Sequence, residues 1–205
     1  MPEPVSQRRK AQTVLKARGI ARLAELRAEG VTAATVSRME RDGELLRLAR
    51  GLYQLPDAPL DVHHSLAEAA KRVPKGVICL VSALAFHQLT DQLPRQVWVA
   101  IGQKDWPPKT DGVPVRLVRF ANRLLTEGVE SHDVGGVPVK VFGVAKTIAD
   151  SFRYRNKIGL AVAIEGLQEA LRQRKATPGE IARQAERGKI ATVIRPYLEA
   201  LTANG

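Results

Sequence analysis

Side chains of the types that can contact nucleic acid are concentrated in one short stretch of the 205-residue chain. An arginine there could donate paired hydrogen bonds to guanine, or could bind a phosphate. Small side chains beside it would allow the backbone to approach the edges of the bases. The residues that we predict to contact DNA are Thr35, Ser37, Arg38, Arg41, Arg47 and Arg50.

Two short helices would position the first four of these residues. Apolar residues at helical spacing predict a helix that starts at Ile20 and ends at Gly30. Thr32 is a favourable N-cap for a second helix over residues 33–42. If Val36 and Met39 face inward, the basic side chains face outward. Two helices joined by a tight turn predict a helix-turn-helix whose second helix enters the major groove.

Arg47 and Arg50 belong to a predicted β-hairpin over residues 44–55, in which Gly51 supplies the positive φ of a tight loop. A basic hairpin directly after a recognition helix is typical of a wing, which contacts the DNA backbone. A further helix is predicted over residues 6–18, with Ser6 as its N-cap. We therefore predict a winged helix-turn-helix domain over residues 1–58, followed by a C-terminal domain over residues 59–205.

The charge of the chain is strongly positive and lies at its two ends. The net charge is +11, and the isoelectric point is about 10.2. Residues 1–55 carry 11 basic and 6 acidic side chains, residues 56–150 carry 11 and 10, and residues 151–205 carry 10 and 5. At the N-terminal end this distribution favours a basic surface over a charge that only keeps helix faces solvated, and at the C-terminal end both interpretations stay open. Nucleic acid is the first partner to consider. Helix-turn-helix units also serve as structural or protein-binding modules, so the motif alone does not settle the function.

Three stretches resemble the AbiEi (abortive infection) antitoxins, and together the resemblance spans nearly the whole chain. The first covers residues 43–56, GELLRLARGLYQLP. The second covers residues 76–90, GVICLVSALAFHQLT, and the third covers residues 145–159, AKTIADSFRYRNKIG.

The resemblance implies an autoregulating antitoxin of a type IV toxin-antitoxin system with a role in phage defence. Its winged helix would repress its own operon by binding inverted repeats upstream, as two protomers of a chain that is a monomer or weak dimer in solution. Its C-terminal domain would neutralise a nucleotidyltransferase-like toxin, and the two proteins need not form a stable complex. The alternative function is a protein-interaction module that inhibits the toxin by direct binding, with little sequence-specific DNA binding.

The C-terminal domain is predicted to combine helices and a small sheet over residues 59–142 with a helical region over residues 143–205. The fold class is therefore α+β. Apolar runs over residues 97–101 and 115–120 predict strands, and Gly135-Gly136 predicts a hairpin over residues 129–142. Helical periodicity follows Phe142.

Positive charge beside an aromatic side chain marks the start of that helical region. It predicts either a surface needed for toxin neutralisation or a solvated helix end, where cations are favoured by the helix dipole. Both interpretations stay open at this point. The residues of the predicted surface are Lys146, Arg153, Arg155 and Lys157.

No motif predicts catalysis, a metal or a cofactor. Cys79 is the only cysteine and lies in an apolar run, which indicates a buried thiol. His63 and His64 are adjacent and would point about 100° apart on a helix, so they do not form an i, i+4 metal pair. A nuclease would need a second carboxylate beside Lys140, where Pro138 and Val139 stand. We expect a non-enzymatic, cytoplasmic protein without a membrane segment.

Overall fold

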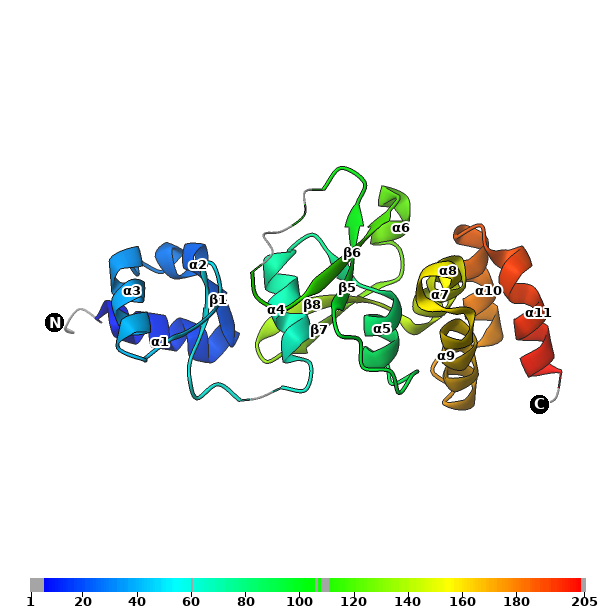
Figure 1. Ribbon diagram of the computed structural model, residues 1–205, viewed down its shortest axis with the longest axis horizontal. Coiled ribbons are helices and arrows are strands. Elements are labelled where there is room, and N and C mark those ends of the chain that lie inside the picture. The colour runs from blue at the N-terminus through cyan, green and yellow to red at the C-terminus, as the bar shows by residue number, and fades with distance from the viewer. Residues whose placement is uncertain (1–5, 60, 106, 108–110, 204–205) are drawn as a thin grey trace. The chain divides into compact units, whose positions relative to one another are not determined.

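The structure is a computed structural model that describes residues 6–59, 61–105, 107 and 111–203. The backbone divides into two compact units. The described residues of the first unit fall within 1–74, 107–114 and 132–139, and those of the second fall within 75–106, 115–131 and 140–205. Helices and strands occur in both (Figure 1), which confirms the mixed α+β class.

Four helices and a small sheet build the first unit. Ser6 caps the first helix by accepting a hydrogen bond of 3.3 Å from the Arg9 N–H, and Thr32 caps the third through the Thr35 N–H. Both caps are the ones that the sequence predicts. The elements are α1 (Gln7–Arg18), α2 (Leu23–Ala28), α3 (Ala33–Arg41), α4 (His64–Arg72), β1 (Ile20–Arg22), β2 (Leu46–Ala49) and β3 (Leu52–Gln54).

The predicted helix start at Ile20 is wrong, because Ile20–Arg22 form strand β1 and α2 begins only at Leu23. β1 pairs antiparallel with β3, and β3 pairs with β2 on its other side. The sheet order is therefore β1-β3-β2. Pairing of Ile20 with Gln54 is a long-range contact, and it overrides the local helical spacing.

One apolar core holds the N-terminal helices and this sheet together. It combines buried side chains from α1, α2, α3 and the hairpin. Because α3 contributes Val36 and Met39, its opposite face is left to solvent. The buried members are Ala11, Leu15, Ala21, Leu26, Val31, Val36, Met39, Leu45, Tyr53 and Leu55.

A second sheet has five strands in the order β6-β5-β4-β8-β7. β5 pairs parallel with β6 and antiparallel with β4, and β4 pairs parallel with β8. The predicted strand and hairpin positions agree with it to within one residue. The strands are β4 (Val77–Ile78), β5 (Val97–Gly102), β6 (Val115–Phe120), β7 (Val129–Val134) and β8 (Val137–Phe142).

Helices complete the second unit, and every described element after Phe142 is a helix (Figure 1). Gly166 lets α9 approach its neighbours, because an added Cβ would lie 2.7 Å from a methyl group of Leu84. Cys79 is fully buried in this core, and burial raises the pKa of its thiol. The helices are α5 (Leu80–Phe86), α6 (Asn122–Thr126), α7 (Val144–Arg153), α8 (Arg155–Ile158), α9 (Leu160–Arg172), α10 (Pro178–Arg187) and α11 (Ala191–Thr202).

Candidate nucleic-acid interface

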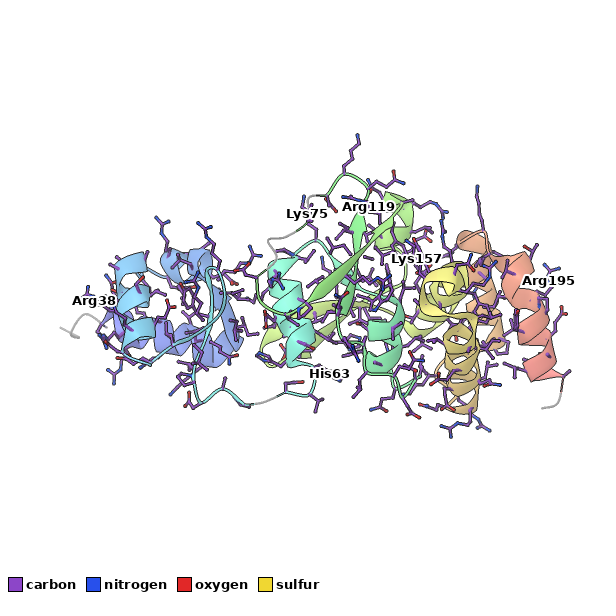
Figure 2. All side chains as sticks on the ribbon, viewed as in Figure 1. Arg38, His63, Lys75, Arg119, Lys157 and Arg195 are labelled. Atoms are coloured by element: carbon purple, nitrogen blue, oxygen red, sulfur yellow. The ribbon has the colours of Figure 1, made fainter. Side chains whose placement is uncertain are left out.

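The face of α3 that points away from the core carries the predicted DNA-contacting side chains. Ser37, Arg38 and Arg41 are exposed, whereas Val36 and Met39 on the other face are completely buried. Figure 2 labels Arg38 on this helix. A short polar residue followed by two arginines on one exposed helix face is a suitable surface for base edges and phosphates.

The start of α3 is fixed to α1 by one side chain that the sequence analysis did not identify. The Gln7 Oε1 atom accepts hydrogen bonds from the Thr32 N–H and the Thr32 hydroxyl, both at 3.0 Å. It also accepts one from the Thr35 hydroxyl at 2.7 Å. Thr35 is half-buried and already hydrogen-bonded, so it positions α3 and presents little of itself to DNA.

The end of α3 is held in a similar way by Arg8. Its guanidinium contacts the Asp42 carboxylate at 2.6 Å and also the Glu44 carboxylate. Two acidic groups next to the helix end are thereby neutralised. Among the described residues, no carboxylate forms an ion pair with Arg38 or Arg41, and these two guanidinium groups are available to a ligand.

The β2–β3 hairpin places Arg47 and Arg50 beside α3. Arg47 stands opposite Tyr53 in the pairing, and its Nη1 atom lies 3.9 Å from a carboxylate oxygen of Glu40 on α3. Gly51 in the turn has a φ of +71°, as the sequence predicts. The exposed side chain of Arg50 follows directly after β2. The hairpin and α3 are thus linked through a charged pair that remains partly accessible to solvent.

A cleft of about 580 Å³ opens in the first unit between α3, the hairpin and α4. Its basic residues outnumber its acidic ones. Three of them, Arg22, Lys71 and Arg72, were missed by sequence reasoning because they come from β1 and α4, which only the fold brings together. The charged lining residues are Arg22, Glu40, Arg47, Arg50, Lys71, Arg72 and Asp111.

One wall of this cleft is fixed by contacts between β1, α2 and α4. The Arg22 Nε atom donates to the Lys71 carbonyl at 2.6 Å, and the Lys71 ammonium lies 2.8 Å from the Glu25 carboxylate. Partial burial alone would raise the pKa of Glu25. Hydrogen bonds from Lys71 and from the Arg22 N–H outweigh burial and hold that pKa below its ordinary value of 4.5.

The predicted C-terminal surface needs a correction at Lys146. This side chain is only 3% exposed and forms a buried ion pair with Asp150 one turn later in α7. Its ammonium also lies 4.6 Å from the centre of the Phe142 ring. Burial raises the pKa of Asp150, and the charge of Lys146 opposes that rise. Lys146 therefore belongs to the core and cannot be part of a docking surface.

The other three residues of that predicted surface lie near helix ends. Arg153 donates to the Gly188 carbonyl at 2.9 Å, and Arg155 donates to the Phe152 carbonyl at 3.0 Å. Both guanidinium groups thus bind carbonyls at helix C-termini, as the helix dipole favours. Lys157 is exposed, and its ammonium lies 5.4 Å from the centre of the Tyr154 ring.

A metal site would need His, Cys, Asp or Glu side chains gathered in one place. Within residues 6–59, 61–105, 107 and 111–203, no group of three His, Cys, Asp or Glu side chains could hold a metal ion. The His87 Nε2 atom lies 2.8 Å from the Phe142 carbonyl, which makes it a structural histidine. In the same part of the chain, no helix is long and apolar enough to cross a membrane.

Comparison with known proteins identifies the segment that carries α1, α3 and the hairpin. Residues 10–56 match the family model described as transcriptional regulator, AbiEi antitoxin. The resemblance seen in the sequence is thereby confirmed for these residues. No protein in the curated collection of known proteins matches the chain.

One solved structure shares the fold of nearly the whole chain. It is the crystal structure of the RV2827C protein from Mycobacterium tuberculosis. The similarity covers 96% of this chain and 80% of that chain, with a TM-score of 0.58 and 13% sequence identity. At that identity the similarity concerns the fold alone.

Proposed function

We propose that this chain, whose residues 10–56 match the family model of the AbiEi antitoxin transcriptional regulators, is a DNA-binding antitoxin that represses its own operon. The observation that carries the proposal is the exposed face of α3. Ser37, Arg38 and Arg41 lie on it, and no carboxylate of the described residues forms an ion pair with the two arginines. The other face is fixed to the core through Val36 and Met39.

In this proposal α3 lies in the major groove and the β2–β3 hairpin is a wing. Arg38 and Arg41 reach base edges or phosphates, and Arg47 and Arg50 bind the backbone beside the groove. Two protomers occupy an inverted repeat, since paired half-sites need two recognition helices. Residues 1–58 form the DNA-binding domain. Gln7 and Arg8 support binding indirectly, because they fix the two ends of α3.

The test is fluorescence anisotropy of the full chain with its own upstream DNA and with a scrambled duplex, over a salt series. We expect tight binding to the first duplex and much weaker binding to the second at physiological salt. Equal and steeply salt-dependent binding to both duplexes would show charge attraction only. In that case the regulatory function would be wrong.

We further propose that residues 59–205 neutralise a nucleotidyltransferase-like toxin. With Lys146 buried, the remaining basic candidates near the end of α7 are the exposed Arg153 and Lys157 and the half-buried Arg155. Co-expression with the toxin tests this proposal: growth should be restored by the chain, and a variant with all three residues changed to alanine should restore it less. Stable co-purification would favour direct binding of the toxin, whereas rescue without a complex would favour the type IV arrangement.

A further inference from the structure

The turn of the β2–β3 hairpin binds a carboxylate of the chain itself. The Arg50 N–H donates a hydrogen bond to the carboxylate of Asp111, which is far away in the sequence but lies in the same unit. Asp111 lines the basic cleft together with the hairpin and α4. A carboxylate therefore occupies a position near the basic groups of the hairpin and of α4.

The residues that follow Asp111 fix it in this place. Gly112 has a φ of +85°, and a Cβ added to it would lie 3.0 Å from the Cβ of Ala49. The Val113 N–H donates to the Glu68 carboxylate at 2.7 Å, and the Arg72 guanidinium donates to the Val113 carbonyl. Residues 111–113 are thus held between β2 and α4.

The electrostatics of the position favour negative charge. The hydrogen bond from the Arg50 N–H holds the pKa of Asp111 below its ordinary value of 3.8, and the charges of Arg72 and Arg47 act in the same direction. Asp111 is nevertheless exposed, so its carboxylate is not needed to fill the core. Another anion could take its place.

The position of the cleft indicates which anion this would be. Ser37 and Glu40 of α3 line the cleft, and Ser37 also lies on the exposed face of that helix. The basic cleft is therefore continuous with the face that we propose to enter the major groove. A duplex on α3 would bring its flanking phosphates toward Arg47, Arg50 and Arg72.

We propose that the cleft between α3, the hairpin and α4 is a binding site for a backbone phosphate of DNA, and that Asp111 occupies it when DNA is absent. This inference rests on the proposed function and deepens it. Asp111 competes with the phosphate, so it weakens binding to every duplex equally. Contacts to the bases then supply a larger share of the total binding free energy.

The test is the variant Asp111→Asn, which removes the charge and retains an oxygen that can accept the Arg50 N–H. The matched control is Asp133→Asn. Asp133 is an aspartate of the same unit that accepts a backbone N–H, from Gly136 at 3.0 Å, but it does not line the cleft. Both variants change the net charge by one, so the comparison separates local competition from general attraction.

We expect Asp111→Asn to bind both the upstream and the scrambled duplex more tightly, by about eightfold at 0.1 M salt. The slope of log K against log salt should become steeper by about 0.9, the value for one additional phosphate contact. The affinity of Asp133→Asn for each duplex should stay within about twofold of that of the unchanged protein. This variant changes the charge only at a position outside the cleft, where salt screens it.

The possible results separate this inference from the proposed function. If Asp111→Asn behaves like Asp133→Asn while the unchanged protein prefers its own DNA, the inference is wrong and the regulatory function stands. If Asp111→Asn gains affinity but no duplex is preferred, the phosphate site stands and the sequence-specific function is wrong. Absence of binding to both duplexes at low salt overturns both.

The fold of each variant is checked by its thermal unfolding. If the melting temperature of Asp111→Asn falls by several degrees, Asp111→Ser replaces it, since a hydroxyl oxygen can also accept the Arg50 N–H. Affinity that increases in neither variant contradicts the inference.

Discussion

The Gln7 Oε1 atom lies 2.7 Å from the Thr35 hydroxyl oxygen, so the first residue of α1 is hydrogen-bonded to the first turn of α3. The same oxygen accepts two hydrogen bonds from Thr32. One amide therefore fixes the N-terminal end of the helix that we propose to read DNA. The orientation of Ser37 and Arg38 depends on this contact, because they lie within the next turn.

Replacing Gln7 by alanine should destabilise the first unit. Three hydrogen bonds to α3 are lost, although water can reach the exposed groups, so we expect a loss of about 1–2 kcal/mol in the free energy of unfolding. Denaturation in urea measures it. Gln12→Ala is the control, since Gln12 lies on the same helix and its side chain has no hydrogen-bond partner among the described residues. Equal effects of the two variants would contradict a specific role of Gln7.

Arg38→Ala tests the reading of bases by α3. If this guanidinium binds a base edge, affinity for the upstream DNA should fall by about 1–3 kcal/mol and discrimination against scrambled DNA should decrease. Arg27→Ala is a matched control, because Arg27 is also exposed but lies on α2. An equal loss on both duplexes would instead assign Arg38 to a phosphate.

The stability of the second unit should depend on Lys146 and Asp150 being present together. Lys146→Met leaves the Asp150 carboxylate buried without its partner, and the expected loss in the free energy of unfolding is about 3–5 kcal/mol. The double variant Lys146→Met, Asp150→Leu should recover most of that loss, since it leaves no uncompensated charge. A double variant less stable than Lys146→Met would contradict this explanation. Urea denaturation measures all three proteins.

Stability should depend on pH through Glu25. Its pKa is lower in the folded protein than its ordinary value of 4.5, so its ion pair with Lys71 stabilises the fold fully above pH 4.5. That contribution is lost as the pH falls through the folded pKa. The unchanged protein should therefore exceed Glu25→Gln in unfolding free energy at pH 7, and the difference should shrink at about pH 3.

Glu199→Gln is the control for this pH dependence, because Glu199 is an exposed carboxylate on α11. It removes a carboxylate that forms no ion pair among the described residues, so it measures the effect of changing the net charge by one at each pH. If the difference for Glu25→Gln changes between the two pH values no more than that for Glu199→Gln, the ion pair with Lys71 does not contribute.

Elements that depend on neighbouring residues were predictable from the sequence. Ser6 and Thr32 were identified as caps, and Gly51 was placed in a turn, because each acts on backbone groups a few residues away. β1 was not predicted. Its three residues become a strand only by pairing with β3, which lies more than 30 residues later.

The candidate site was predictable to a similar extent. The outward face of α3 followed from helical periodicity around Val36 and Met39. The contacts that fix this helix involve Gln7 and Arg8, and the spacing of the α3 residues carries no signal for them. Lys146 was misplaced because a charged residue in a polar segment is usually exposed, and its burial depends on Asp150 and on the surrounding core.

Cys79 is inaccessible in the folded second unit and is the only cysteine of the chain. A maleimide dye would therefore modify a cysteine introduced in place of the exposed Arg27 of α2, outside the proposed DNA-contacting residues, and leave the native thiol unmodified. A single fluorophore could then report the distance between α2 and labelled DNA. The slow reaction of the Cys79 thiol with maleimide would itself be informative. Its rate measures how often local unfolding exposes the core of the second unit.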